Sequence, residues 1–135
     1  HRFIQFLTFG QPVKIESWKG IDDGKIASFS FWLFGWKKIS VVHENYSASR
    51  NYLYFVDRGT VLPFGLNNWE HHHTVKSHKD GSVIIDRVIL DESSLVKRFL
   101  VSPIMLFPIL IRKITYKIWF YFLEGKSWNT LKKYD

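Results

Sequence analysis

Apolar and polar residues alternate along most of the first ninety positions, in short runs separated by turn-forming residues. Alternation with a period of two is typical of β-strands, because successive side chains point to opposite faces of a sheet. Regular short strands with turns between them favour an antiparallel meander. The pattern predicts six strands, at residues 12–19, 25–34, 36–45, 51–57, 69–76 and 82–90.

The last two predicted strands flank Asp80-Gly81, a dipeptide that favours the tight turn of a β-hairpin. With Asp80 and Gly81 as the two turn residues, His73 lies opposite Val88. Asp86 then lies diagonal to His73 on the same face of the hairpin, within reach of a long side chain.

After the sixth strand the apolar residues recur at helical spacing. Ser102-Pro103 predicts a helix start, since serine is a preferred N-cap and proline suits the first helical position. Pro108 lies deeper, where it removes a backbone hydrogen bond and clashes with the preceding turn. We therefore expect a kink or restart there, with the main helix at residues 108–124 and Gly125 as its end.

The predicted helix carries one continuous apolar stripe, made of Phe107, Ile111, Ile114, Ile118 and Phe122. We expect a curved sheet to clasp the helix along this stripe. A transmembrane span is disfavoured, because the apolar run over residues 100–111 is only 12 residues long and a span needs about 20. Because the helix is basic and aromatic, a position in a membrane interface stays open.

These elements predict a single α+β domain, with a curved antiparallel meander wrapped around a long C-terminal helix. Its expected parts are a lead-in, the meander, the helix and a basic tail, at residues 1–10, 11–90, 102–125 and 126–135. The 46% hydrophobic and 18% aromatic content excludes a disordered chain and suits a β-rich fold with a large interior.

The charge and the cysteine content of the chain exclude only a few classes of partner and binding site. The net charge is +7, of which +6 comes from Leu95 onward. This segment either keeps an apolar helix solvated or contacts an anionic membrane. We expect no nucleic-acid partner, because no RNA-binding motif accompanies the aromatics. The absence of cysteine excludes disulfides and thiolate zinc sites, and fits a cytoplasmic location.

The fifth strand carries the most suggestive polar residues. Trp69, His71 and His73 share one face, so they are buried, bound to something, or both. A buried Asp86 beside them would hold one imidazole tautomer and favour its protonated form. The cluster could fix strand register or orient a ligand. Two histidines at this spacing can chelate zinc, but no third ligand is spaced convincingly nearby, so no metal site is predicted.

No catalytic signature is found in the sequence. It has no glycine-rich phosphate loop, no nucleophile elbow and no carboxylates paired at suggestive spacing. Glu16, Glu44 and Asp57 are each interpreted as surface residues. We therefore predict no catalytic residue and no cofactor.

Several short motifs together resemble the bacterial SRPBCC ligand-binding proteins of the START/Bet v 1-like superfamily, over about residues 8–123. They are Phe55-Val56-Asp57, Pro63-Phe64-Gly65, Trp69-x-His71-x-His73-x-Val75, Asp80-Gly81 and Asp86-x-Val88, followed by the apolar helix. The resemblance implies the helix-grip fold. That fold begins with a strand and two short helices, whereas only about ten residues precede the first strand here. We therefore expect an exposed sheet edge, which could pair with a second copy in a homodimer.

The resemblance also implies a hydrophobic small molecule or lipid bound between sheet and helix. Two alternatives stay open: a polyketide cyclase-type enzyme using the same cavity, and a peripheral membrane or adaptor protein using the basic C-terminal segment. We expect binding rather than catalysis. The residues expected to contact the ligand are Phe29, Phe31, Trp69, His71, His73, Asp86, Val88, Phe107, Ile111, Ile114 and Ile118.

Overall fold

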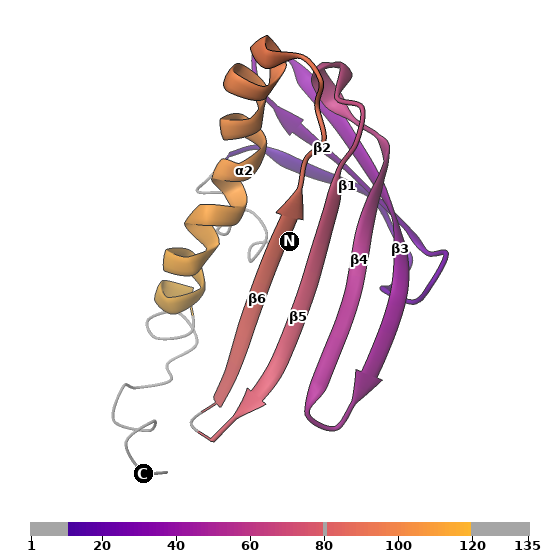
Figure 1. Cartoon of the computed structure of the whole chain (residues 1–135), viewed down its shortest axis with the longest axis vertical. Coiled ribbons are helices and arrows are strands. Elements are labelled where there is room, and N and C mark those ends of the chain that lie inside the picture. Colours follow the sequence, from indigo (N-terminus) through magenta and orange to yellow (C-terminus); the bar gives the residue numbers. More distant parts are fainter. Residues whose placement is uncertain (1–10, 80, 120–135) are drawn as a thin grey trace.

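The computed structural model describes residues 11–79 and 81–119, which form one antiparallel sheet and one long helix (Figure 1). The strands pair in sequence order, so the sheet is a simple meander from β1 to β6. The elements are β1 (Val13–Trp18), β2 (Ile26–Trp32), β3 (Trp36–Ser49), β4 (Tyr52–Val61), the 3-10 turn η1 (Pro63–Gly65), β5 (Glu70–His78), β6 (Gly81–Ile89) and α2 (Leu95–Ile118).

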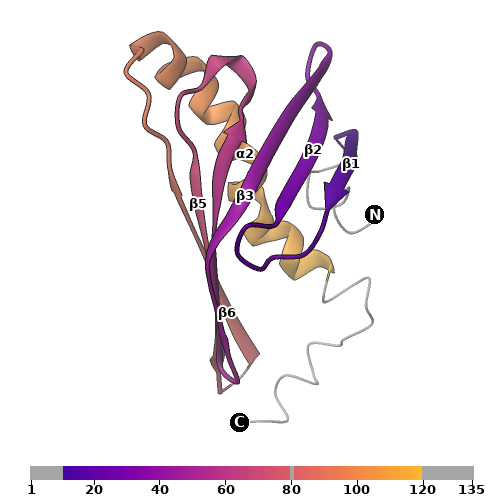
Figure 2. The same ribbon diagram turned by 90° about the vertical axis from the view of Figure 1, so that its right-hand side faces the viewer.

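The sheet is curved, and α2 lies between its two ends in the side view (Figure 2). A small core of Ala27, Val41, Leu66, Trp69 and Met105 joins the sheet to the helix. The α+β class, the six strands and the C-terminal helix predicted from the sequence are therefore confirmed. The predicted lead-in, the helix end at Gly125 and the basic tail lie outside the described residues.

Strand β3 is longer than predicted, because Asn45 does not end it, and β4 continues past its predicted end at Asp57 to Val61. The register of β3 against β4 shifts between Glu44 and Ser47, and Asn45 has a φ of 58°. An extra residue in a left-handed conformation is a β-bulge, which bends a strand without ending it. Asn45, a residue type that favours turns, therefore lies in a bulge here, and β3 continues to Ser49.

The register of the β5–β6 hairpin differs from the prediction. His78 pairs with Gly81, so the turn begins directly after His78, one position earlier than expected. His71 therefore faces Val88, and His73 faces Asp86 directly. The predicted pairing of His73 with Val88 was wrong, because Gly81 belongs to β6 and not to the turn.

The helix begins earlier than predicted. Its N-cap is Ser94, whose side chain accepts a hydrogen bond from the backbone N–H of Lys97. Ser102 and both prolines, Pro103 and Pro108, lie inside the helix. The predicted start at Ser102 and restart at Pro108 were wrong. Packing of the inward face, which buries Met105, compensates for the backbone hydrogen bonds that the prolines remove.

Within the described residues, no helix combines the length and the apolarity that crossing a bilayer requires.

Candidate functional site

A cavity of about 460 Å³ lies between the curved sheet and α2. The sheet contributes inward-facing residues from its first five strands, because every second side chain points to the concave face. Most of them are apolar or aromatic: Val13, Trp18, Ala27, Phe29, Phe31, Ile39, Val41, Phe55 and Trp69. The helix closes the other side with Ile104, Met105, Pro108, Ile109, Arg112 and Tyr116.

The residues expected from the sequence to contact a ligand are only partly on this wall. Phe29, Phe31, Trp69, His71 and His73 all line the cavity. Asp86 and Val88 do not line it. Asp86 lies behind the histidines and bonds to them, whereas Val88 packs against the core cluster.

The predicted inward stripe of the helix was wrong. Phe107 and Ile114 are 55% and 61% exposed, Ile118 is 37% exposed, and Ile111 is half-buried away from the cavity wall. The helix is apolar around most of its circumference, so its pattern did not determine which arc faces the sheet. The inward arc contains a cation, Arg112, which the predicted apolar stripe did not include. Phe122 lies outside the described residues.

Three histidines and two aspartates form one continuous hydrogen-bonded network beside the cavity. His43 donates from Nδ1 to Oδ1 of Asp57 at 2.6 Å, and His73 donates from Nε2 to Oδ2 of Asp57 at 2.9 Å. The Nδ1 of His73 lies 3.2 Å from Oδ1 of Asp86, which also accepts from Nε2 of His71 at 3.0 Å. The order along the network is His43, Asp57, His73, Asp86, His71.

Strand pairing brings these side chains together. Asp57 on β4 pairs with His43 on β3 and with His71 on β5, while His73 pairs with Asp86 on β6. All five therefore lie on one face of four adjacent strands. Ring contacts hold the imidazoles further: Phe55 stacks on His73 with centroids 4.4 Å apart, and the centroids of the His71 and His73 rings are 3.8 Å apart.

The pKa values of the two histidines of β5 are shifted in opposite directions. Burial by itself lowers the pKa of His73, but hydrogen bonds to Asp57 and Asp86 outweigh it and hold this pKa above its usual value. Burial also lowers the pKa of His71, and there the bond to Asp86 only partly offsets it. The arrangement therefore favours the protonated form of His73 and the neutral form of His71.

The pKa values of the two aspartates in the network are both lowered. Burial raises the pKa of Asp57, yet bonds from His73 and His43 bring it below its usual value. Burial also raises the pKa of Asp86, and bonds from His71 and His73 lower it far more. Both aspartates are therefore ionised over the whole neutral range. The interpretation of Asp57 as a surface residue was wrong, since it lines the cavity with a side chain only 17% exposed.

Two buried nitrogens on the cavity wall have no hydrogen-bond partner among the described residues. They are Nε of Arg112 and Nε2 of His43. An unpaired buried donor or acceptor costs about 1–3 kcal/mol, so such groups in a cavity wall are candidates to bind a ligand or a water.

Sequence reasoning missed His43, Asp57, Arg112 and Tyr116. A local signal existed for the first two: Val41 and His43 alternate with polar neighbours, as do Phe55 and Asp57, which predicts a shared inward face. Arg112 and Tyr116 had no such signal, because the phase of the helix is set by its packing.

Comparison with protein-family models, curated proteins and solved structures finds no match to this chain.

Proposed function

We propose that this protein binds a small amphipathic molecule, such as a lipid or a polycyclic compound with one polar end, between the sheet and α2. The cavity that carries this proposal is about 460 Å³, a size typical of small-molecule sites. Its wall is aromatic and aliphatic over most of its area, with polar groups gathered in one region. This combination suits a ligand with an apolar body and a single polar group.

The apolar wall supplies most of the affinity. Phe29 and Phe31 from β2, Trp69 from the residue just before β5, and Ile109 from α2 present large side chains to the cavity. Removing apolar surface from water contributes about 25 cal/mol per Å² before the cost of ordering the ligand. A strand scaffold avoids a further cost of ordering the protein wall, because the sheet positions the wall before the ligand arrives.

The polar groups determine how the ligand lies. Arg112 reaches the cavity from the helix, and its unpaired Nε can donate to a carboxylate or another acceptor oxygen. His71, whose pKa burial lowers, lines the cavity from β5. A ligand whose polar end is an acceptor, and above all an anion, therefore fits best beside Arg112.

The architecture supports the same proposal. Six meandering strands that curve around a C-terminal helix correspond to the meander and the C-terminal helix of the helix-grip fold of START/Bet v 1-like ligand carriers. We include membership of that fold, and a cytoplasmic location, in the proposal.

The test is direct detection of a ligand on the full-length protein. Native mass spectrometry of the purified protein should show a co-purified molecule or an adduct with lauric acid. Lauric acid should also displace a neutral apolar dye, Nile red, at a stoichiometry of one per chain. Absence of any adduct together with no displaceable dye would refute the proposal.

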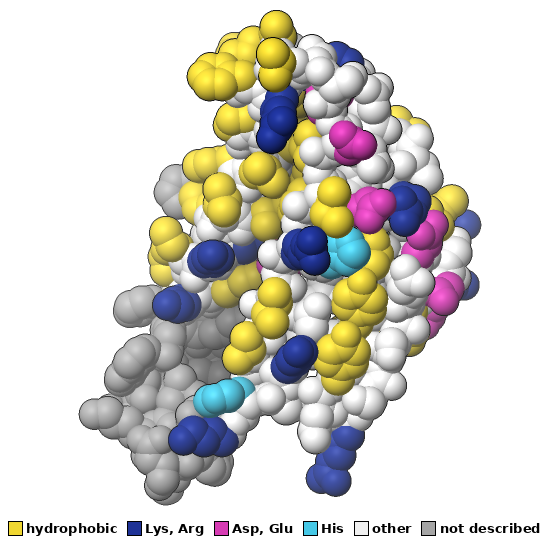
Figure 3. All heavy atoms as spheres, viewed as in Figure 1, with side chains coloured by type: hydrophobic (Ala, Val, Ile, Leu, Met, Phe, Trp, Pro, Cys, Tyr) yellow, Lys and Arg dark blue, Asp and Glu magenta, His cyan; other side chains and the backbone are white. Residues whose placement is uncertain are grey.

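A second candidate function, association with an anionic membrane surface, rests on the outward face of α2. Large apolar side chains are exposed along it (Figure 3): Val96, Phe99, Phe107, Leu110 and Ile114 are 55–80% exposed. Arg98, Lys113 and Lys117 are exposed on the same helix. An apolar helix face flanked by cations is typical of helices that lie in the membrane interface. Membrane contact by this face would bring the cavity close to a source of lipid.

A further inference from the structure

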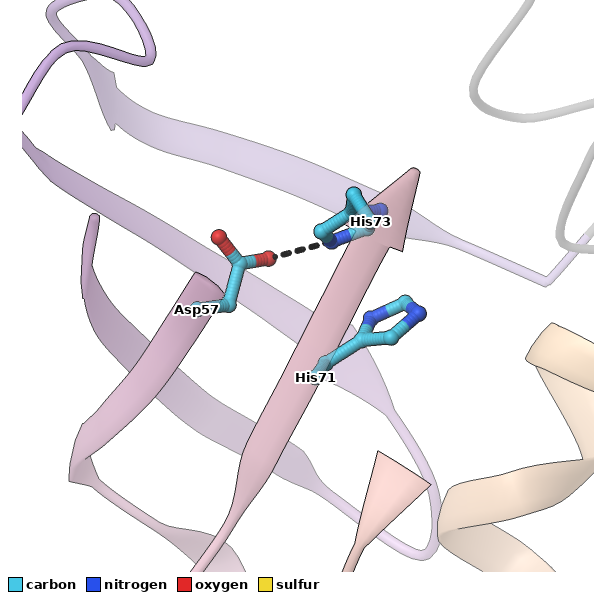
Figure 4. A group of neighbouring side chains, drawn as sticks. All are labelled: Asp57, His71 and His73. Carbon is cyan, nitrogen blue, oxygen red and sulfur yellow. Dashed lines mark hydrogen bonds and ion pairs between the residues drawn. The ribbon is translucent and has the colours of Figure 1, made fainter. Parts of the chain in front are cut away.

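The structure points to a metal site in the cavity wall: we infer that Asp57, His71 and His73 bind one divalent first-row transition metal ion. One candidate ligand atom from each of these side chains lies within 4.8 Å of the other two (Figure 4). The inference stands on the geometry of the His–Asp network alone and does not rest on the proposed ligand binding.

The three donors need only a small rearrangement to hold an ion. Zinc binds nitrogen and carboxylate oxygen at about 2.0–2.2 Å, which places tetrahedral donors about 3.4 Å apart. Nε2 of His73 and Oδ2 of Asp57 are already 2.9 Å apart, joined by the hydrogen bond whose proton the ion would replace. All three side chains come from two hydrogen-bonded strands, so the donors stay close together without the ion.

The surrounding groups are arranged as metal sites require. Metal-binding histidines usually donate their second ring N–H to a carboxylate, which fixes the ring and makes the ligand more basic. Asp86 accepts from Nε2 of His71 and faces Nδ1 of His73, which leaves Nδ1 of His71 and Nε2 of His73 for the ion. His43 likewise holds Oδ1 of Asp57 and leaves Oδ2.

Charge and donor type select the kind of ion. Asp57 and Asp86 together carry two negative charges, which one divalent ion neutralises when the histidines are neutral. Two imidazoles and one carboxylate suit Zn²⁺, Co²⁺ or Fe²⁺, whereas Mg²⁺ and Ca²⁺ prefer oxygen ligands. Three protein ligands leave a further coordination position, and because all three residues line the cavity, a molecule bound there can occupy it.

The test is titration of the metal-stripped full-length protein with Zn²⁺ by calorimetry, and with Co²⁺ by visible absorption. One ion per chain and the intense absorption of four- or five-coordinate Co²⁺ are expected. His71→Ala, His73→Ala and Asp57→Asn should each weaken binding at least 100-fold. Asp86→Asn should weaken it 10–100-fold, as losing an orienting carboxylate does at known sites.

His72→Ala is the matched control. His72 lies on the same strand, between the two candidate ligands but on the other face, where it bonds to Tyr54. Zn²⁺ affinity should stay within about twofold of the unmodified protein, given the usual independence of sites without shared partners. Equal loss in His72→Ala and His71→Ala, or stoichiometric binding that survives His71→Ala and His73→Ala together, would overturn the inference.

X-ray absorption spectroscopy of the Zn²⁺-loaded unmodified protein tests the site without any variant, so a substitution that impairs folding leaves the question decidable. The spectrum should show two imidazole ligands and only nitrogen or oxygen donors. A first shell without imidazole, or no stoichiometric binding of either ion, refutes the site. Neither outcome bears on displacement of Nile red by lauric acid, so failure of the metal site and failure of ligand binding are distinguishable.

Discussion

His73 and Asp86 face each other directly across β5 and β6, with Nδ1 of the imidazole 3.2 Å from Oδ1 of the carboxylate. The other ring nitrogen of His73 bonds to Asp57. An imidazole that donates to a carboxylate from each nitrogen carries both protons, so these two contacts favour a cationic His73 in the cavity wall. His73 is the central member of the five-residue network.

Asp86→Asn should lower the free energy of unfolding of the metal-stripped protein by about 2 kcal/mol, because hydrogen bonds to a charged group contribute about 1.5–3 kcal/mol. Urea denaturation followed by circular dichroism measures the change. Asp91→Asn is the control, since Asp91 is exposed just beyond the end of β6, and its effect should stay within about 0.5 kcal/mol. Equal effects of the two substitutions would contradict a structural role for the network.

The two histidines of β5 should titrate on opposite sides of the ordinary histidine pKa of about 6.5. In metal-stripped protein, ¹⁵N NMR of the imidazoles should show His73 still protonated above that pH and His71 still neutral below it. The groups that determine this are Asp57, Asp86 and, on the helix, Arg112, which lowers the pKa of His71 electrostatically. Coincident titration near the ordinary value would refute the assignment.

The raised pKa of His73 also gives a sign for stability. A group whose pKa is higher in the folded state stabilises fully below its unfolded pKa and loses that contribution as pH rises through the folded value. Unfolding free energy should therefore carry a component that declines above about pH 6.5. His73→Gln should remove this component while His72→Gln retains it, as urea denaturation over a pH series would show.

Arg112→Gln should weaken lauric acid binding about tenfold or more, because the guanidinium loses a charge-assisted bond to the carboxylate. Binding of dodecanol, which is uncharged, should change much less. Lys113→Gln is the control, since the side chain next along the helix is exposed and does not line the cavity. Nile red displacement measures all three proteins. A similar loss for acid and alcohol would contradict an anion-binding role for Arg112.

Ser94→Ala should lower the free energy of unfolding by about 1 kcal/mol, the usual cost of losing an N-cap. Ser102→Ala should not lower it by a comparable amount, because the buried Ser102 hydroxyl has no hydrogen-bond partner among the described residues. Thermal and urea denaturation of both variants check this. The reverse ranking would place the helix start at Ser102 after all.

Replacing Phe107 and Ile114 together by serine should reduce binding to phosphatidylglycerol vesicles more than tenfold, since each buried apolar side chain contributes about 1.5–3 kcal/mol. The control replaces Val83 and Ile85, which are exposed on β6, away from the helix face. Vesicle sedimentation measures both. Membrane association through α2 is refuted if the two double variants bind equally well, or if the unmodified protein does not sediment.

The contrast between Phe29 and Phe107 shows where the local hydrophobic pattern predicts the facing of a side chain and where it does not. Phe29 was assigned correctly to the inward face, because a strand has only two faces and alternation distinguishes them. Phe107 was assigned wrongly, because α2 is apolar around most of its circumference and several arcs were equally able to face the sheet. The arc that packs inward includes the polar residues Arg112 and Tyr116, so hydrophobicity did not select it. The fit of the helix against the sheet decides which arc faces inward.

The sequence alone determined the α+β class, the order of six strands and the inward placement of Trp69, His71 and His73. These depend on local periodicity and turn chemistry, which act between near neighbours in the chain. Only the tertiary structure decided that Asp57 and His43 join the histidines and that Asp86 lies opposite His73. Moving the hairpin turn by one residue shifts every cross-strand partner by two residues, and register is settled by the packing of the whole sheet.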